Sequence, residues 1–244
     1  MNLKDKVAVV TGGSSGIGRA IAVALAKDGC KVVFTYNSNE KGADETLNAL
    51  GGGEKASKFK VDIRKENEID ALYKFIEEKF GKLDILVNNA GKTLMGDNLD
   101  LKLWRGVFDI TLFPAIKFTS GAVNLMKLGG RILNISSIFG DDHANNKKFV
   151  PFGAAKAALN NFTSTMAKNL GPKILINGIM PGYVLTPLWG DISEADIKSN
   201  SAETLINKFI MPSEVADIAL AIIKNDAMTG EVVVVDGGLS LKTV

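Results

Sequence analysis

The amino-acid sequence predicts a single α/β domain, residues 1–244, in which helices cover both faces of a doubly wound parallel sheet. Two observations support this fold class. Apolar runs of strand length alternate with amphipathic stretches of helix length along the chain. The strand-like runs are also apolar at almost every position, which is typical of strands buried on both sides. We therefore expect seven strands in one sheet.

Each predicted strand is a short run rich in Val, Ile, Leu or Phe, bounded by polar or turn-forming residues. In chain order these runs are residues 6–11, 31–36, 57–61, 84–87, 131–135, 174–179 and 231–235.

The stretches between the strands carry apolar residues at helical spacing. They are residues 16–27, 39–50, 66–80, 104–127, 152–169 and 215–224. The first places Ile17, Ile21 and Leu25 on one face, and the second ends at the three glycines 51–53. Pro114 interrupts the fourth stretch, so we expect a boundary or a kink there.

Composition excludes several classes of function. The 29 Lys and Arg residues nearly balance the 27 Asp and Glu residues, which does not favour a nucleic-acid or membrane surface. Cys30 is the single cysteine and His143 the single histidine, so neither an internal disulfide nor a His-cluster metal site is expected. The first residues do not read as a targeting peptide, and no apolar run approaches the ~18 residues of a membrane helix. We expect a cytoplasmic protein that binds no metal.

A glycine-rich turn follows the first strand and opens the first helix. It reads Thr11-Gly12-Gly13-Ser14-Ser15-Gly16-Ile17-Gly18. Such a turn lets a pyrophosphate approach the backbone, and the helix start offers free N–H groups and a positive dipole end. In this strand–turn–helix context the sequence predicts a nucleotide-binding loop.

The spacing Gly-x-x-x-Gly-x-Gly resembles the glycine signature of the short-chain dehydrogenase/reductase family. Further motifs follow the predicted strands: Asp62-Ile63, Asn88-Asn89-Ala90-Gly91, Asn134-Ile135-Ser136-Ser137, and Pro181-Gly182 with Thr186. The likeness extends over essentially the whole chain and is nearest to the 3-oxoacyl-carrier-protein reductases. It implies a Rossmann-type sheet, a nicotinamide dinucleotide cofactor, a small-molecule substrate and a homodimer or homotetramer.

The resemblance also implies which residues contact the cofactor. They are Gly12, Ser14, Ser15, Gly16, Ile17, Gly18, Tyr36, Asn37, Ser38, Lys41, Asp62, Ile63, Asn89, Ala90, Gly91, Lys156, Pro181, Gly182, Val184 and Thr186.

The end of the second strand bears on the choice of cofactor. A carboxylate there would accept a bond from the ribose hydroxyl and repel a 2′-phosphate. The chain has Thr35-Tyr36-Asn37-Ser38 instead, with no acid before Glu40 and with Lys41 close by. Arg19 follows the glycine loop. We therefore expect NADP(H) rather than NAD(H), although both cations could equally be solvated helix charges.

The family's catalytic set is an Asn, a Ser and a Tyr-x-x-x-Lys pair, and this chain keeps only half of it. Ser137 and Lys156 stand at matching positions, whereas Phe152 stands at the Tyr position and Thr111 at the Asn position. In the family the phenol gives a proton to the substrate oxygen and the Asn holds a water that relays protons. Phe152 cannot donate a proton.

Three explanations are compatible with Phe152. The residue could be an engineered exchange of Tyr that traps a bound complex. The chain could be a natural reductase whose substrate needs no enzymatic proton, such as an iminium. Finally, the scaffold could serve non-redox chemistry, for instance as a cyclase, or bind the cofactor without catalysis.

Several residues are expected to border a partly apolar substrate. They are Leu94, Ile138, His143, Tyr183, Leu188 and Trp189. His143 has an alternative interpretation as an exposed loop residue, and Leu188 and Trp189 have one as packing residues.

Overall fold

The computed structural model describes residues 1–141 and 146–241. Its strands are β1 (Val7–Val10), β2 (Lys31–Tyr36), β3 (Ala56–Lys60), β4 (Leu83–Asn88), β5 (Met126–Ile135), β6 (Ile174–Pro181) and β7 (Val232–Val235). They form one parallel seven-stranded sheet in the order β3-β2-β1-β4-β5-β6-β7. The predicted fold class is confirmed.

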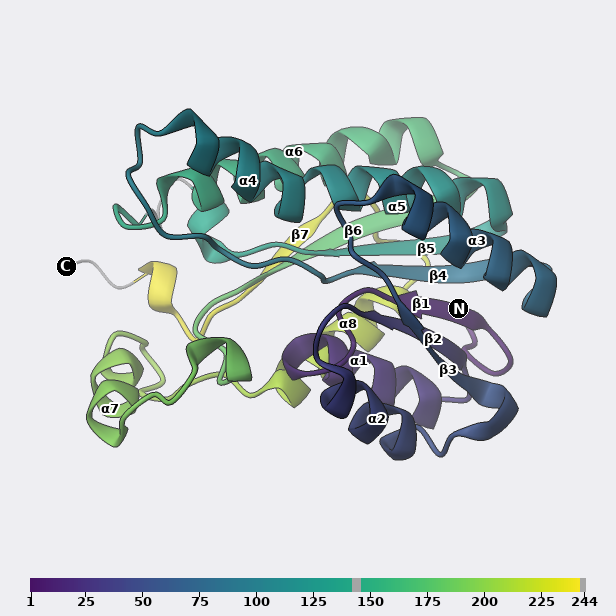
Figure 1. Ribbon diagram of the computed structural model, residues 1–244, viewed down its shortest axis with the longest axis horizontal. Helices are drawn as coiled ribbons and strands as arrows, with labels where there is room; N and C mark the ends of the chain where they lie inside the picture. Colours follow the sequence, from purple (N-terminus) through teal and green to yellow (C-terminus); the bar gives the residue numbers. More distant parts are fainter. Residues whose placement is uncertain (142–145, 242–244) are drawn as a thin grey trace.

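Helices cover both faces of the sheet. They are α1 (Gly16–Lys27), α2 (Glu40–Ala49), α3 (Glu66–Phe80), α4 (Leu101–Thr111), α5 (Phe113–Leu125), α6 (Val150–Leu170), α7 (Glu194–Ala202) and α8 (Pro212–Lys224). Figure 1 shows α1, α2 and α8 on one side of the sheet and α3 to α6 on the other. Helix α7 stands apart on the segment that connects β6 to α8, which we call the arm.

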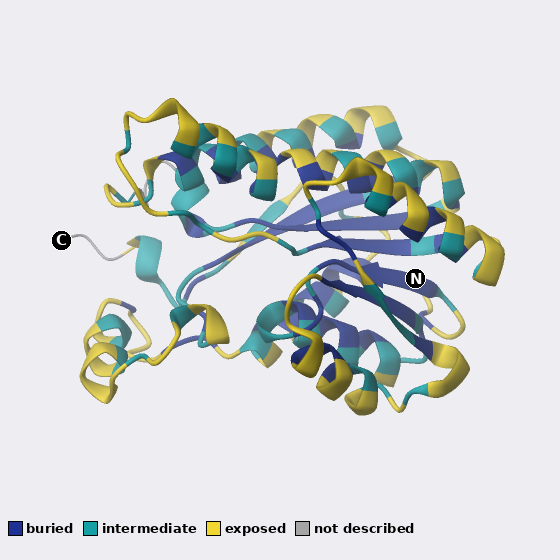
Figure 2. Cartoon of the chain, viewed as in Figure 1, coloured by how far each residue is buried: buried dark blue, intermediate teal, exposed yellow. Residues whose placement is uncertain are grey.

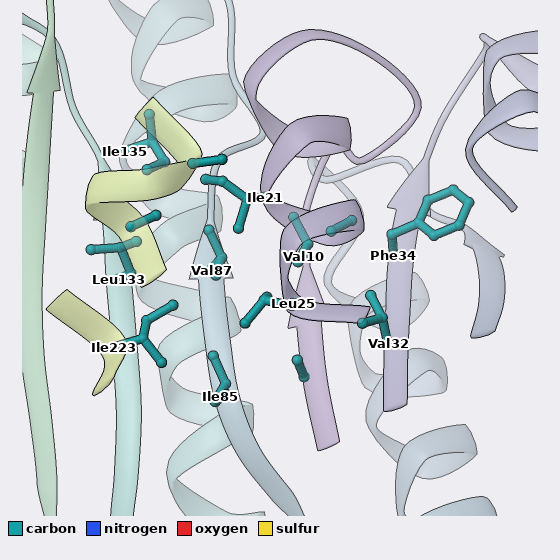
Figure 3. Packing of buried hydrophobic residues seen from close by; sticks show 14 of the residues in the cluster. Val10, Ile21, Leu25, Val32, Phe34, Ile85, Val87, Leu133, Ile135 and Ile223 are labelled. Atoms are coloured by element: carbon teal, nitrogen blue, oxygen red, sulfur yellow. The ribbon is translucent and has the colours of Figure 1, made fainter. Parts of the chain in front are cut away.

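Two hydrophobic clusters hold these layers together, and the alternation of β1 shows why. Ala8 and Val10 face α1 and α8, whereas Val7 and Val9 face α3 and α5. Figure 3 shows the first cluster, with Ile21 and Leu25 of α1 packed over β1 and β4. Because helices cover both faces of the sheet, all four residues of β1 are buried and all four are apolar; Figure 2 shows the buried central strands in dark blue.

The strand order reverses beside β1, which pairs with β2 on one side and with β4 on the other. The chain therefore leaves the carboxyl ends of β1 and β4 in opposite directions and opens a crevice between them. In open α/β sheets, ligands bind at such a point.

The boundary predicted at Pro114 within the stretch 104–127 is confirmed, because α4 ends at Thr111 and α5 starts at Phe113 with Pro114 in its first turn. A proline fits there because its missing N–H would have no helical partner. The fifth strand starts at Met126 rather than at residue 131, since Met126 pairs with Leu83 before a register shift.

Helix α7 was not predicted from the sequence. Its residues supply no apolar stripe, and none of them is buried. The signal that could have found it is a cap, because the Ser193 hydroxyl accepts a hydrogen bond from the Asp196 backbone N–H at 3.1 Å. No helix in the described part of the chain has the length and apolar character needed to cross a bilayer.

Candidate active site

The glycine loop connects β1 to α1 in a conformation that requires glycine. Gly12 and Gly16 have φ of +68° and +55°, the left-handed region that other residues avoid. A Cβ on Gly18 would collide with the Gly12 carbonyl oxygen. Ser15 at the start of α1 makes no side-chain cap and the first turn holds no acid, so no side chain of this turn occupies the first backbone N–H groups of the helix. This cradle suits a pyrophosphate.

Thr11 ties the glycine loop to the end of β4. Its hydroxyl accepts hydrogen bonds from the backbone N–H groups of Asn89 and Ala90, both at 2.9 Å. The Asn89 amide donates back to the Thr11 carbonyl at 2.9 Å. The two motifs on either side of the crevice are therefore held in one fixed arrangement.

Arg19 braces the loop from behind. Its guanidinium donates to the Ser14 carbonyl at 2.7 Å and to the Thr46 hydroxyl at 2.9 Å, and it pairs with Glu45 at 3.0 Å. Nε and Nη2 are committed to these groups, so Arg19 is not a freely solvated helix charge. Lys41 is exposed in the first turn of α2, with no ion-pair partner among the described residues.

The residues predicted for the adenosine half lie at the ends of β2 and β3. Tyr36 is buried, and its carbonyl accepts a bond from the Val61 N–H at 2.8 Å, which aligns the two strand ends. Asn37 and Ser38 follow directly and are exposed. Asp62 is buried and its carboxylate is bound by Arg64, whose hydrogen bonds lower the Asp62 pKa to about 2. Ile63 packs at the edge of the core.

Ser137 and Lys156 meet at the end of β5. The Ser137 oxygen accepts a bond from the Phe139 N–H at 3.2 Å, which leaves the hydroxyl proton available for a substrate oxygen. Lys156 is buried and donates to the Ile135 carbonyl at 2.7 Å. Burial lowers the Lys156 pKa to about 8.

Phe152 and Lys156 are one turn apart on α6 and share a face. The Lys156 nitrogen lies 5.6 Å from the centre of the Phe152 ring, within the range of a cation–π contact. The ring occupies the position where the family resemblance places a phenol, and it offers the lysine a π face in place of a hydroxyl.

Thr111 lies at the end of α4, close to Lys156. Both residues line a cavity of about 10 Å³ together with Thr11 and Asn88, which is the size of one water molecule. The Thr111 hydroxyl and the Asn88 side-chain oxygen are buried here without a protein partner. The cavity thus places two hydrogen-bonding groups beside the buried lysine.

The segment after β6 returns to the glycine loop. A Cβ on Gly16 would lie 3.2 Å from the Thr186 side chain, so these two motifs are in contact. Gly182 donates to the Val235 carbonyl at 2.9 Å, which anchors the turn after Pro181 to β7. Val184 is buried and forms a bridge with Ile210.

The substrate predictions divide into three groups. Leu94 is half-buried, and Leu188 is 70% exposed on the short helix η3 (Pro187–Trp189), so both can meet a ligand. Ile138 is only 2% exposed and Trp189 packs edge-on against Tyr183 and Phe209. The Trp189 ring thus packs on these two rings, and its contact with a substrate stays a prediction. His143 lies outside the described residues.

Sequence reasoning missed three residues that shape the site. Arg64 lies two residues after Asp62, and an i,i+2 ion pair in a turn could have been anticipated. Glu203 accepts a hydrogen bond from the Tyr183 hydroxyl at 2.9 Å, and Phe209 completes the aromatic group. These last two are distant in sequence from Tyr183, and no local pattern indicates them.

Three comparisons place the chain among known proteins. The family model described as short chain dehydrogenase matches residues 6–197. A 3-oxoacyl-[acyl-carrier-protein] reductase of Aquifex aeolicus (strain VF5) is 35% identical, with 98% of this chain and 99% of that protein covered. Glucose 1-dehydrogenase 2 of Bacillus subtilis (strain 168) is 34% identical, with 98% and 96% covered.

A variant of actinorhodin polyketide ketoreductase, whose structure was solved with NADPH, is similar in fold. It superposes with a TM-score of 0.87 at 31% identity and covers 97% of each chain.

Proposed function

Because the chain belongs to the short-chain dehydrogenase family, we propose that it is an NADP(H)-dependent reductase of a small, partly apolar carbonyl or imine compound. The observation that carries this proposal is the intact cradle at the reversal of strand order. The glycine loop, Thr11 and Asn89 are joined there by hydrogen bonds. A loop with no ligand would need neither this fixed arrangement nor the uncapped backbone N–H groups at the start of α1.

The cofactor would span the crevice from β3 to β6. The backbone amides at the start of α1 would hold the pyrophosphate, Asp62 the adenine, Lys156 the nicotinamide ribose, and Thr186 the carboxamide end. When bound, the nicotinamide ring supplies the hydride for reduction.

Preference for NADP(H) rests on the charges near the end of β2. Asn37 and Ser38 carry no charge that would repel a 2′-phosphate, and exposed Lys41 is near enough in sequence to attract one. The carboxylate of Glu40 lies 3.8 Å from the Lys58 ammonium, which offsets its charge. Arg19 holds the loop through Nε and Nη2.

Ser137 and Lys156 are present, but Phe152 occupies the position of the proton donor for the substrate oxygen. The Ser137 hydroxyl can orient a substrate oxygen, but Phe152 gives it no proton. A ketone needs that proton as the hydride arrives, because its oxygen becomes an alkoxide. An iminium becomes a neutral amine when it accepts the hydride and needs none. We therefore expect this chain to reduce cyclic imines, in their protonated form, better than ketones.

The substrate would enter beside exposed Leu188 and half-buried Leu94. Phe139 and Phe149 stack with ring centres 5.7 Å apart on the elements that flank Ser137 and Phe152. This apolar surface favours a compound with a hydrocarbon portion. We propose that the enzyme works in the cytoplasm.

The test supplies the chain with NADPH and a panel of cyclic imines, β-keto esters and quinones, and follows the nicotinamide absorbance. We expect the fastest oxidation of NADPH with the iminium acceptors. Binding of NADPH without oxidation by any acceptor, in this chain and in Phe152→Tyr, would contradict a reductase and indicate a non-redox role.

A further inference from the structure

Asp62 and Arg64 form a closed ion pair directly after β3. The Asp62 carboxylate accepts the Arg64 backbone N–H at 3.1 Å, its Nε at 2.9 Å and its Nη2 at 2.6 Å. The Asp62 side chain is 12% exposed, whereas that of Arg64 is 60% exposed. The arginine thus covers the carboxylate from the solvent side and fixes its plane.

The pair determines how many hydrogen bonds the Asp62 carboxylate can still accept. An ionised carboxylate has roughly four acceptor positions. Arg64 takes two of them on Oδ1 and one on Oδ2, so one position remains on Oδ2. The hydrogen bonds from Arg64 lower the Asp62 pKa to about 2. At neutral pH the remaining oxygen position can only accept a hydrogen bond and never donates one.

We propose that Arg64 is a positioning residue that holds Asp62 so that its remaining acceptor reads the 6-amino group of the cofactor's purine. The inference rests on the proposed function, which places the adenine at Asp62. A 6-amino purine offers a donor at this atom and a 6-oxo purine offers an acceptor. The fixed carboxylate would therefore select the first and repel the second.

A neighbouring ion pair provides a matched control. Lys65 lies beside Arg64 and is 58% exposed, and its ammonium is 2.8 Å from Glu68 Oε1. The other Glu68 oxygen accepts the Asp62 backbone N–H at 2.7 Å. Lys65 therefore braces the same turn without touching the Asp62 carboxylate, so its removal tests for a purely structural effect.

The experiment measures the dissociation constants of NADPH and of its 6-oxo analogue, reduced nicotinamide hypoxanthine dinucleotide phosphate, by nicotinamide fluorescence. It compares the unmodified chain with Arg64→Met, Lys65→Met and Asp62→Asn. Thermal unfolding of each variant is recorded alongside. A folding defect would weaken the binding of both ligands equally. The ratio of the two dissociation constants therefore measures how well the site discriminates the 6-amino from the 6-oxo purine.

We expect the unmodified chain and Lys65→Met to bind NADPH about tenfold or more tightly than the analogue, as one hydrogen bond to a charged group allows. Arg64→Met should lower this ratio at least about threefold, and Asp62→Asn should abolish it. An unchanged ratio in Arg64→Met, or no preference in the unmodified chain, would overturn the role of Arg64 alone. Failure to bind either dinucleotide would overturn the proposed function and this inference with it.

Discussion

At the scale of single residues, Lys156 combines burial, charge and position at the centre of the site. Its amino group is bonded to the Ile135 carbonyl and faces the Phe152 ring and the Thr111 cavity. Burial is the cause of its lowered pKa of about 8. The ammonium is therefore present at neutral pH but is lost within a mildly alkaline range.

This pKa predicts how cofactor affinity depends on pH. The Lys156 ammonium would donate hydrogen bonds to the nicotinamide ribose hydroxyls, so cofactor binding favours the charged form and raises the Lys156 pKa. The affinity for the cofactor must therefore fall as pH rises above about 8. Lys156→Met should weaken NADPH binding roughly tenfold and remove this decline. Fluorescence titrations across the neutral to alkaline range measure both effects. The same decline in Lys156→Met would assign it to another group.

Motif spacing in the sequence identifies Ser137, Lys156, Phe152 and Thr111 as candidate site residues, and the fold brings the first three to the end of β5 and the turn of α6 beside it. The Asp62–Arg64 pair is local, and its i,i+2 spacing could have indicated it. The bracing by Arg19 could not be predicted, because it depends on how α1 packs against α2.

At the scale of elements, predictability follows burial. Strands between two helical layers carry a continuous apolar signal, so their existence was predicted correctly. Their ends were less certain, because Met126 pairs with Leu83 through a register shift that no local pattern reveals. Helix α7 gave no apolar signal since it buries no residue. The helical conformation of α7 therefore depends on its N-terminal cap and on the points where the arm joins β6 and α8.

The dependence of α7 on its cap gives a prediction. Ser193→Ala removes the bond from the Asp196 N–H and should fray the helix at a local cost of about 1 kcal/mol. Because α7 covers no core, global stability should stay the same. Amide hydrogen exchange should therefore quicken in residues 194–202 alone. A fall in Tm of several degrees would show that α7 supports the core.

At the scale of the whole molecule, several large apolar side chains of the sheet and its helices are exposed to solvent. Phe113 and Ile116 are exposed on α5, and Val234 is exposed on β7, the last strand of the sheet. Large exposed apolar side chains of this kind are found at subunit interfaces. They support the homodimer or homotetramer implied by the family resemblance, and this assembly stays a prediction.

A charge at the interface should break the assembly. Phe113→Lys places an ammonium in a face that would be buried between copies, and such a charge costs several kcal/mol. We expect a smaller species by light scattering after gel filtration. Leu188→Lys is the control. Like Phe113, Leu188 is apolar and exposed, but it lies on the arm and not on α5. Equal masses for both variants and the unmodified chain would exclude the α5 surface as an interface.

The central claim is that this chain keeps the cofactor site of a reductase and that Phe152, at the position of the proton-donating Tyr, limits the reduction of ketones. The most direct test compares the rate of NADPH oxidation with a β-keto ester in the unmodified chain and in Phe152→Tyr. A positioned general acid contributes about 10²–10⁴ in rate, so we predict an increase of that order in Phe152→Tyr at unchanged NADPH affinity. Equal rates at equal cofactor occupancy would contradict the claim, because the missing phenol would then not be what limits the reaction.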